Sequence, residues 1–409
     1  MNQRIPLLIL LVVSQVINAE QNLVQVVAQD LGSQDPGSFK KRPIIKAIDK
    51  TFNLVNEKNS IELNETAPLT GSIALIGQDF TYGMNMVFNK ANVSRQLPDG
   101  TLIRLTTLND EFKQPLAERN IRASIMRSPI FIGNFGTDIH LALRPMIKDK
   151  KIVLLFPTTG HPDLYSSELE YTMNYRPSIE RELEALIKYA VTKEHKRKIA
   201  IFYEENRWGE GCVVAAEKLL QKYGLELTAK VSYQQNTVNV MPAVKEIVKR
   251  RPQVIICASC YRPTYNFVQL VLNSGFQHCL FLGLGETAPM QHLINKSRGL
   301  KMVSSSVTPD PEHSNLPLVK QYRADMQKYL PYRAISQFSL EGYIAGSLMV
   351  RMLKKLEPPL TLGKLLQGFE SIKNAHFGGM PLNFDPQTRS LSSNIWINKG
   401  NGEEWKRLT

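Results

Sequence analysis

The chain has 409 residues, a formal net charge of +13 from 50 Lys plus Arg against 37 Asp plus Glu, and four cysteines. Its 43% hydrophobic and 21% charged content is ordinary for a globular protein, so extensive disorder is not expected. The length exceeds a single core of usual size and indicates two lobes or domains. Four cysteines are too few for a fold built on disulfides.

The positive charge suggests nucleic-acid binding, but its distribution does not support that class of function. The basic clusters at 195–198 and 249–251 have no aromatic stacking pattern beside them. Each cluster immediately precedes an apolar strand-like run, at 199–203 and 254–258. They should therefore lie at the amino ends of those strands, opposite the end where ligands collect. We expect a solvated basic surface and no nucleic-acid partner.

The N-terminus has the features of a secretory signal peptide. Arg4 precedes the apolar run Ile5–Val13, and the small residue Ala19 ends the segment. This pattern predicts export to the periplasm with cleavage after Ala19, the alternative being an uncleaved anchor helix. Later apolar runs are too short to span a bilayer, so the mature chain is expected not to be membrane-spanning. Residues 20–59 form a polar arm or linker, with a possible short helix from about Ile44 to Val55.

From residue 60 onward, short apolar runs alternate with amphipathic stretches. Predicted strands are Ile61–Leu63, Leu102–Thr106, Ile130–Ile132, Ile152–Phe156, Ile199–Tyr203, Leu227–Tyr233, Val254–Ala258 and Leu280–Leu284. Predicted helices between them are Phe80–Asn89, Gln114–Met126, Asp138–Ile147, Ile179–Val191, Glu210–Tyr223 and Pro242–Lys249. Strict alternation predicts parallel sheets with crossover helices, and it occurs twice, before and after about Arg176. The fold class is therefore α/β, with two doubly wound, Rossmann-like lobes and a cleft between them.

The tail departs from this alternation. Helices are predicted at Leu316–Tyr329, Gln337–Lys355 and Leu362–Phe369, followed by a hairpin formed by Asn394–Asn398 and the segment near Trp405. A helical tail of this length can return to the first lobe. We expect lobe 1 to comprise 60–176 and 306–391, and lobe 2 to comprise 177–305 and 392–409, joined by a hinge with several crossovers.

Sequence motifs of catalysis are missing. The chain has no dinucleotide-binding or phosphate-binding glycine loop, no zinc helix of the His-Glu-x-x-His type and no nucleophile elbow. Its seven histidines lack ligand spacing. We therefore expect no cofactor, no metal site and no catalytic residues, and do not expect an enzyme.

The pair Cys257 and Cys260 is the one local pattern with redox or zinc potential. A second pair is missing, so we favour Cys257 as a core residue at a strand end and Cys260 as part of a cleft loop. If Cys212 begins the helix after the neighbouring strand, Cys212 and Cys260 could form a disulfide. Cys279 begins its own strand and should lie at the opposite end from Cys257.

A series of segments, in order, resembles one known family. The loop Ala67-Pro-Leu-Thr-Gly with the turn at Gly77-Gln78 comes first, then Ile132-Gly-Asn-Phe-Gly-Thr137 and Phe156-Pro-Thr-Thr-Gly-His-Pro-Asp-Leu164. Tyr171–Arg176, Trp208-Gly-Glu-Gly211 and Phe281-Leu-Gly-Leu-Gly-Glu286 follow. Together they resemble the type I periplasmic solute-binding proteins of the Leu/Ile/Val-binding family, which supply ABC importers. The resemblance covers about Ile61 to Lys406.

The resemblance implies a ligand site between the lobes. Its residues would be Ile76, Phe135, Thr137, Thr158, Thr159, Gly160, Trp208, Tyr261 and Glu286. Thr137 and the N–H groups at its helix start would hold a ligand carboxylate. Glu286 or an adjacent carbonyl would accept an ammonium, with Trp208 and Tyr261 as aromatic lids. The structural alternatives are that the threonines cap helices, that Trp208 packs on a lobe surface, and that Glu286 only lies near a helix start.

Some positions depart from the family pattern. Gly160 stands where amino-acid binders usually have threonine, and Ile76 where an aromatic residue is frequent, while Glu286 is offset by one residue. The ligand could therefore be an amino acid, an amide or an organic acid. We predict a periplasmic protein that captures a small polar ligand by hinge closure for an ABC permease or a sensor. The alternative is a ligand-free interaction or regulatory module in the envelope, and a third class, an envelope enzyme, rests only on the cysteine pair.

Overall fold

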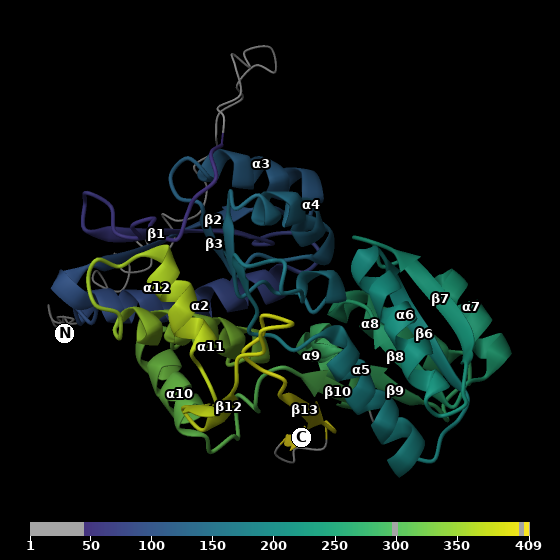
Figure 1. The fold of residues 1–409 in the computed structure, drawn as a ribbon. Helices are drawn as coiled ribbons and strands as arrows, with labels where there is room; N and C mark the ends of the chain where they lie inside the picture. The colour runs from purple at the N-terminus through teal and green to yellow at the C-terminus, as the bar shows by residue number, and fades with distance from the viewer. Residues whose placement is uncertain (1–44, 297–301, 401–404, 409) are drawn as a thin grey trace, which may run out of the picture.

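The structure is a computed structural model that describes residues 45–296, 302–400 and 405–408. The predicted signal peptide and residues 20–44 of the arm lie outside this range. Two sheets form the centres of two lobes, which are seen apart in Figure 1. In the part of the chain that is described, none of the helices combines the length and apolar character needed to cross a membrane.

The first sheet is parallel throughout. Its strand order is β2-β1-β3-β4-β5. The strands are β1 (Ser60–Ala67), β2 (Leu102–Asn109), β3 (Ile130–Ile132), β4 (Val153–Leu155) and β5 (Thr172–Met173). Connecting helices are α2 (Ala74–Val93), α3 (Gln114–Ser124) and α4 (Thr137–Lys148). The order places β1 near the centre, as expected for a doubly wound sheet.

The second sheet has the strand order β14-β13-β10-β9-β8-β6-β7. Its strands are β6 (Ile199–Glu205), β7 (Leu227–Gln234), β8 (Val254–Ala258), β9 (Leu280–Gly283), β10 (Met302–Ser306), β13 (Ile395–Asn398) and β14 (Lys406–Leu408). Its helices are α5 (Ile179–Lys188), α6 (Arg207–Gln221), α7 (Met241–Arg250), α8 (Tyr261–Asn273) and α9 (Ala288–Lys296). The strands from β6 to β10 run parallel, and β13 and β14 add an antiparallel edge.

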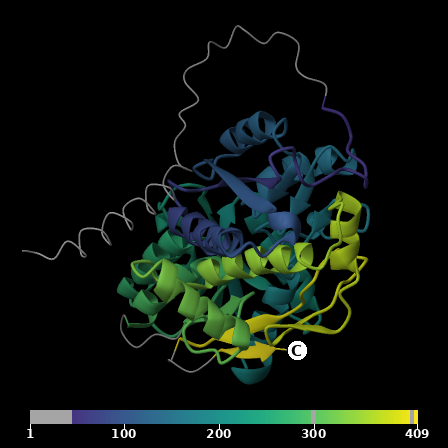
Figure 2. The ribbon, with the colours of Figure 1, turned by 90° about the vertical axis from the view of Figure 1, so that its left-hand side faces the viewer.

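The tail helices return to the first lobe, as the sequence predicted. They are α10 (Pro317–Tyr329), α11 (Gln337–Leu353) and α12 (Leu362–Glu370), followed by the small hairpin β11 (Ala375–Phe377) and β12 (Met380–Leu382). Helix α11 lies along α2 in both ribbon views (Figures 1 and 2). The chain thus crosses between the lobes after β5, after β10 and before β13. The exact boundary residues of the lobes stay predictions.

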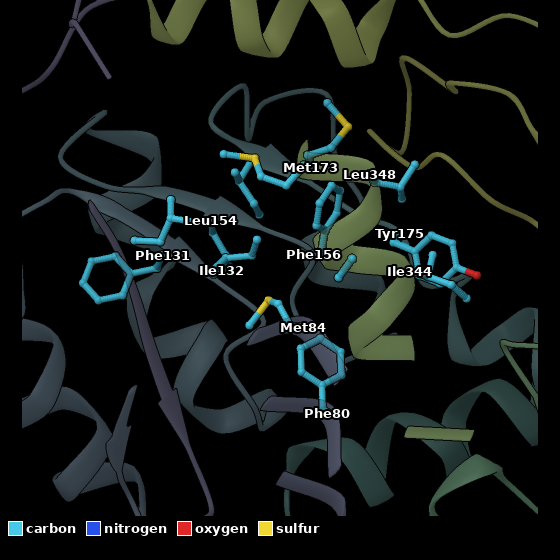
Figure 3. Packing of buried hydrophobic residues seen from close by; sticks show 14 of the residues in the cluster. Phe80, Met84, Phe131, Ile132, Leu154, Phe156, Met173, Tyr175, Ile344 and Leu348 are labelled. Carbon is cyan, nitrogen blue, oxygen red and sulfur yellow. The ribbon is translucent and has the colours of Figure 1, made fainter. Parts of the chain in front are cut away.

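Glycines allow α2 and α11 to approach closely. A Cβ on Gly83 would lie 1.9 Å from the carbonyl oxygen of Ser339, and one on Gly342 would lie 1.9 Å from that of Phe80. The two backbones therefore touch at this crossing. Apolar side chains from α2, β3, β4 and α11 fill the lobe beside it (Figure 3). Burial of this continuous cluster, including Phe131 and Ile344, holds the tail helix in place.

The sequence predicted the alternation but not every element. No helix forms at 45–55; this segment has turns and isolated bridges, with Ile48 N–H donating to Lys150 O at 2.8 Å and Leu54 N–H to Leu360 O at 2.8 Å. The segment 45–55 therefore lies along the surface of lobe 1. Strand β10 was missed because its sequence, Met-Val-Ser-Ser-Ser, is polar. Its serines are nevertheless buried, and Ser305 Oγ donates to Glu182 Oε2 at 2.7 Å.

Candidate functional site

A narrow cleft with about 50 Å³ of free space lies between the lobes, beyond the carboxyl ends of the strands. This is where open parallel sheets place their ligands. It is lined by Ile73, Ile76, Phe112, Phe135, Gly136, Thr137, Thr158, Arg176, Glu204, Asn206, Trp208, Cys260, Glu286 and Phe338. This free space is below the roughly 300–1,000 Å³ that is usual for small-molecule pockets, so a bound solute requires the lobes to move apart.

Two segments that continue past β3 and β4 form the lobe 1 wall. Asn134 O accepts hydrogen bonds from Thr158 N at 2.9 Å and from Thr158 Oγ1 at 2.8 Å, and Phe135 bridges to Thr158 in parallel. The hydroxyls of Thr137 and Thr159 are 2.7 Å apart. Gly136, with φ +94°, makes the turn into α4 and brings Thr137 to the cleft as the first residue of that helix.

Phe112 enters the cleft from a strained turn after β2. Glu111 and Phe112 have φ of 54° and 59°, a backbone region that side chains disfavour. The turn is held because Asp110 Oδ1 accepts the Phe112 N–H at 2.8 Å. A Cβ on Gly136 would lie 3.2 Å from Cε2 of Phe112, so the glycine also makes room for the ring. Strain of this kind persists where the surroundings fix it, frequently at ligand sites.

The lobe 2 wall comes from the end of β6 and the start of α6. Asn206 caps α6: its Oδ1 accepts the Gly209 N–H at 2.9 Å, and its Nδ2 donates to Glu204 Oε2 at 2.7 Å. This cap fixes Trp208 in the first turn, where it is 9% exposed. Burial raises the pKa of Glu204 to about 7, although hydrogen bonds from Tyr233 and Asn206 oppose that shift.

An ion-pair network closes the hinge end of the cleft. Arg176, in the crossover after β5, donates from Nε and NH2 to the two carboxylate oxygens of Glu341 at 2.6 and 3.0 Å. Its NH1 donates to Glu286 Oε1 at 2.8 Å. Glu341 belongs to α11 of lobe 1 and Glu286 to the short helix η4 (Gly285–Thr287) of lobe 2. The lobes are also joined by Gln337 Nε2, which donates to Gly285 O at 2.6 Å.

Six of the nine predicted ligand residues line the cleft: Ile76, Phe135, Thr137, Thr158, Trp208 and Glu286. Thr159, Gly160 and Tyr261 are not among the lining residues. Thr159 lies behind Thr137 and supports its hydroxyl. Whether any of the nine contacts a ligand stays a prediction.

Gly160 and Tyr261 have structural surroundings that explain their positions. Gly160 O accepts the Ile179 N–H at 2.9 Å, and a Cβ on Gly160 would lie 2.7 Å from that nitrogen. The close approach leaves no space for a threonine. Tyr261, the first residue of α8, is fully buried and packs with the core cluster of lobe 1. It therefore joins the lobes instead of covering an open pocket.

Several lining residues have only weak signals in the sequence. Arg176 was predicted only as part of the crossover, and Glu204 and Asn206 only as part of the turn segment 203–211. A charged residue directly after an apolar strand, as at Glu204, was the available signal. No local pattern marked Phe112 or Phe338, which reach the cleft through a turn and through the tail helix α11.

The possible disulfide between Cys212 and Cys260 is not formed, and all four cysteines are free and buried. The disulfide required Cys212 to begin the helix after β6, but α6 begins at Arg207. Cys212 packs in the core of lobe 2, whereas Cys260 lies with the lobe 1 cluster, its Sγ 3.9 Å from Glu204 Oε2. Among the residues described, three or more His, Cys, Asp or Glu side chains nowhere gather as a metal site would require.

Two parallel-sheet lobes around a cleft at their carboxyl ends define a periplasmic-binding-protein architecture. The family model for periplasmic binding proteins matches residues 66–404. The chain therefore belongs to the periplasmic binding protein family, as the resemblance implied.

Relatives and solved structures agree with this assignment. The Leu/Ile/Val-binding protein homolog 7 of Brucella abortus (strain 2308) is 19% identical over 311 residues, which cover 73% of this chain and 77% of that protein. A possible leucine/isoleucine/valine-binding protein from Rhodopirellula baltica SH 1 superposes with a TM-score of 0.77 at 21% identity, over 89% of this chain and 98% of that one.

Two further structures contain ligands. A branched chain amino acid ABC transporter protein from Thermus thermophilus with bound valine has a TM-score of 0.75 at 16% identity, covering 86% of this chain and 95% of that one. A solute-binding protein from R. palustris in complex with benzoate has a TM-score of 0.72 at 14% identity, covering 85% and 95%. At these identities the structural likeness establishes the fold.

Proposed function

We propose that this chain captures a small solute in the cleft between its lobes and delivers it to an ABC importer or a sensor. The observation that carries the proposal is the cleft itself, with a hydrogen-bonded threonine wall from lobe 1 facing Glu204, Trp208 and Glu286 of lobe 2. A solute that touches both walls favours the closed arrangement of the lobes. Binding then shifts the population between open and closed forms.

The relatives support a small polar or aromatic ligand. Family members of similar fold have been solved with valine and with benzoate, and others are described as Leu/Ile/Val-binding homologs. The cleft has both apolar and polar walls, so an amino acid, an amide or an organic acid fits this range. We also propose an ABC permease as the partner that receives the solute.

The test is a thermal-shift screen of the mature protein against amino acids, amides, amines and organic acids. A ligand of the native state raises the melting temperature with concentration. Thr137→Val and Thr158→Val remove one hydroxyl each from the lobe 1 wall and should weaken every hit. Thr192→Val, in the exposed π-helical turn Tyr189–Lys193 that follows α5, is the matched control and should leave the shift unchanged. Equal shifts in all three variants would contradict this cleft as the site.

A second function, docking of another protein by a ligand-free fold, is favoured by one observation. The protein's own groups already bridge the lobes, through Arg176 with Glu286, Gln337 with Gly285 O, and Ser72 Oγ with Asn236 Oδ1 at 2.6 Å. This function predicts that no solute in the screen raises the melting temperature. It also predicts that solution scattering of the purified protein already matches closed lobes.

We propose secretion to the periplasm, with cleavage after Ala19. The N-terminal pattern of Arg4, an apolar run and Ala19 supports this placement. The intact mass of the protein recovered from the periplasmic fraction of an expressing bacterium should equal that of a chain beginning at Glu20. Recovery of the full-length mass in the membrane fraction would instead support an uncleaved anchor.

A further inference from the structure

The polar groups of the cleft are mainly acceptors once their internal hydrogen bonds are assigned. Thr158 gives its hydroxyl proton to Asn134 O at 2.8 Å, so only its lone pairs face a ligand. The amide of Asn206 is engaged on both sides, by Gly209 N–H and by Glu204. Glu286 Oε2 is buried without any hydrogen-bond partner. A buried acceptor left in this state is stabilised when a ligand brings it a donor.

Among the described residues, Arg176 is the one cation that lines the cleft, and its charge is already neutralised. Each of the three side-chain nitrogens of Arg176 donates to a carboxylate oxygen, two to Glu341 and one to Glu286. Arg176 and Glu341 are 5% and 4% exposed, so solvent screens their interaction weakly. One positive charge against Glu286 and Glu341 leaves this end of the cleft with net negative charge, and Glu204 adds a further carboxyl group.

The backbone N–H groups at the start of α4, near Thr137, already have part of their hydrogen bonds within the protein. A helix N-terminus attracts anions, which is why Thr137 was expected to hold a carboxylate. Asp138 follows immediately in α4, and its carboxylate accepts the backbone N–H of Asp138 itself and that of Arg207. A negative charge therefore already occupies the first turn of α4. A second anion from a ligand would meet repulsion there.

Aromatic rings complete the walls. Phe112, Phe135 and Trp208 line the cleft, and Phe135 is held by an edge-to-face contact with Phe80 at 5.3 Å between ring centres. Phe338 is also present, but the Arg176 guanidinium lies 5.9 Å from its ring centre. Aromatic faces attract cations, and more strongly where water is excluded. Carboxylates and aromatic rings together form a site that suits an organic cation with an apolar carbon skeleton.

Resting on the proposed function, we infer that the cleft selects a small organic cation, a primary amine on an aromatic or branched apolar body, and rejects free carboxylates. The ammonium donates to Glu286 Oε2 and to the lone pairs of Thr158, with Glu204 contributing charge from the opposite wall. The apolar body packs among Phe112, Phe135 and Trp208. This assignment narrows the ligand classes that the fold alone permits.

The cleft also makes binding depend on pH. Burial raises the pKa of Glu204 to about 7, so this carboxyl group gains its negative charge between about pH 6 and 8. The groups that face it are Asn206, Tyr233 of β7, Cys260 at the start of α8 and Asp138 of α4. An alkylamine, with a pKa near that of lysine at about 10.4, stays protonated over this range. The affinity for an amine should therefore rise as pH rises from 6 to 8.

The experiment uses pairs of solutes with one carbon skeleton and opposite charge: benzylamine with benzoate, and isopentylamine with isovalerate. The melting temperature of the mature protein is followed at pH 7.5 against concentration. At least one amine should raise it while the matched carboxylate does not. If a carboxylate stabilises as much as its amine or more, or if neither amine stabilises, the inference is wrong.

Variants locate the effect. Glu286→Gln and Glu204→Gln should each weaken amine binding by about tenfold or more, since hydrogen bonds to charged groups contribute more than neutral ones. The side-chain nitrogens of Arg176 donate to Glu341 and Glu286, so a Glu204 variant tests the charge without breaking the hinge ion pair. Glu246→Gln removes an exposed carboxylate on α7 and should have no effect. Unchanged affinity in both cleft variants would overturn the assignment.

Failure of the inference and failure of the proposed function give different results. A carboxylate or zwitterion whose stabilisation is lost in Thr158→Val contradicts cation selection but preserves capture in this cleft. Absence of any stabilising solute, in the pairs and in the wider screen, contradicts both.

Discussion

Arg176 and Glu341 form a buried two-point ion pair, with Nε 2.6 Å from Oε1 and NH2 3.0 Å from Oε2. Arg176 follows the last strand of the first sheet, and Glu341 lies in the helix that packs along α2. The third nitrogen, NH1, reaches Glu286 of lobe 2. The pair therefore anchors the crossover at the point where the two lobes and the cleft meet.

Removing one member of this ion pair should lower the free energy of unfolding substantially. Glu341→Gln leaves a buried guanidinium short of a charge, and breaking such pairs costs about 3–5 kcal/mol of unfolding free energy. Urea unfolding of the mature protein measures the change. Glu246→Gln breaks the exposed pair with Arg250 and should cost no more than about 1 kcal/mol. Similar losses in the two variants would contradict a structural role for the hinge pair.

The contribution of Glu65 to stability should fall as the pH rises from about 4.5 to 8. Burial raises the pKa of Glu65 from 4.5 to about 8, while hydrogen bonds from Thr107 and Thr81 oppose the shift. Over this window the folded state keeps a proton that the unfolded state releases. The stabilisation is complete below the unfolded pKa and is lost as pH rises through the folded one.

Glu65→Gln should flatten this dependence by more than about 1 kcal/mol, because the amide cannot ionise. It should not abolish the dependence, since burial also raises the pKa of Asp110 to about 6 and that of Glu204 to about 7. Urea midpoints between pH 4.5 and 8.5 give the comparison. A curve that overlies that of the parent protein would show that Glu65 titrates normally in the fold.

The contact between α2 and α11 should not tolerate a methyl group. In Gly342→Ala the new Cβ would lie 1.9 Å from Phe80 O, so the helices must separate. Overpacking of this kind costs about 1–3 kcal/mol or more. Ser347→Ala, also on α11 but only half-buried, is the control and should change stability little. Thermal unfolding of the two variants checks the difference, and a neutral Gly342→Ala would contradict the close approach.

The four cysteines should remain thiols. Burial raises the pKa of Cys257 to above its usual range, and that of Cys279 to about 12, so both react slowly in the folded protein. A thiol reagent should label little of the native protein and all four cysteines after unfolding without reductant. Labelling of only two cysteines under those conditions would show a disulfide.

The sequence predicted the architecture because its signals are local. Apolar runs such as Ile199–Tyr203 and Val254–Ala258 mark buried parallel strands, and these strands form where predicted. Strand β10 was not predicted because its sequence is polar. Its buried serines are paired with Glu182 and Gln291, which lie outside the strand. Tertiary hydrogen bonds compensated for a sequence with little apolar character.

The site was predicted in part for the same reason. Thr158 lies in the loop after β4, and Thr137 begins α4 after the loop that follows β3, so their place at the sheet edge could be inferred. Arg176 and Phe338 reach the cleft only because the crossover and α11 meet there, and no pattern near them in the sequence encodes that meeting. Gly160 was assigned a ligand role, whereas its surroundings show a packing constraint against Ile179.

Calorimetric titration of the mature protein with benzylamine and with benzoate, at pH 7.5, tests the central claim most directly. The account predicts saturable binding of benzylamine that weakens about tenfold or more in Glu286→Gln and Glu204→Gln, and no saturable binding of benzoate. Saturable binding of benzoate with none of benzylamine would contradict it.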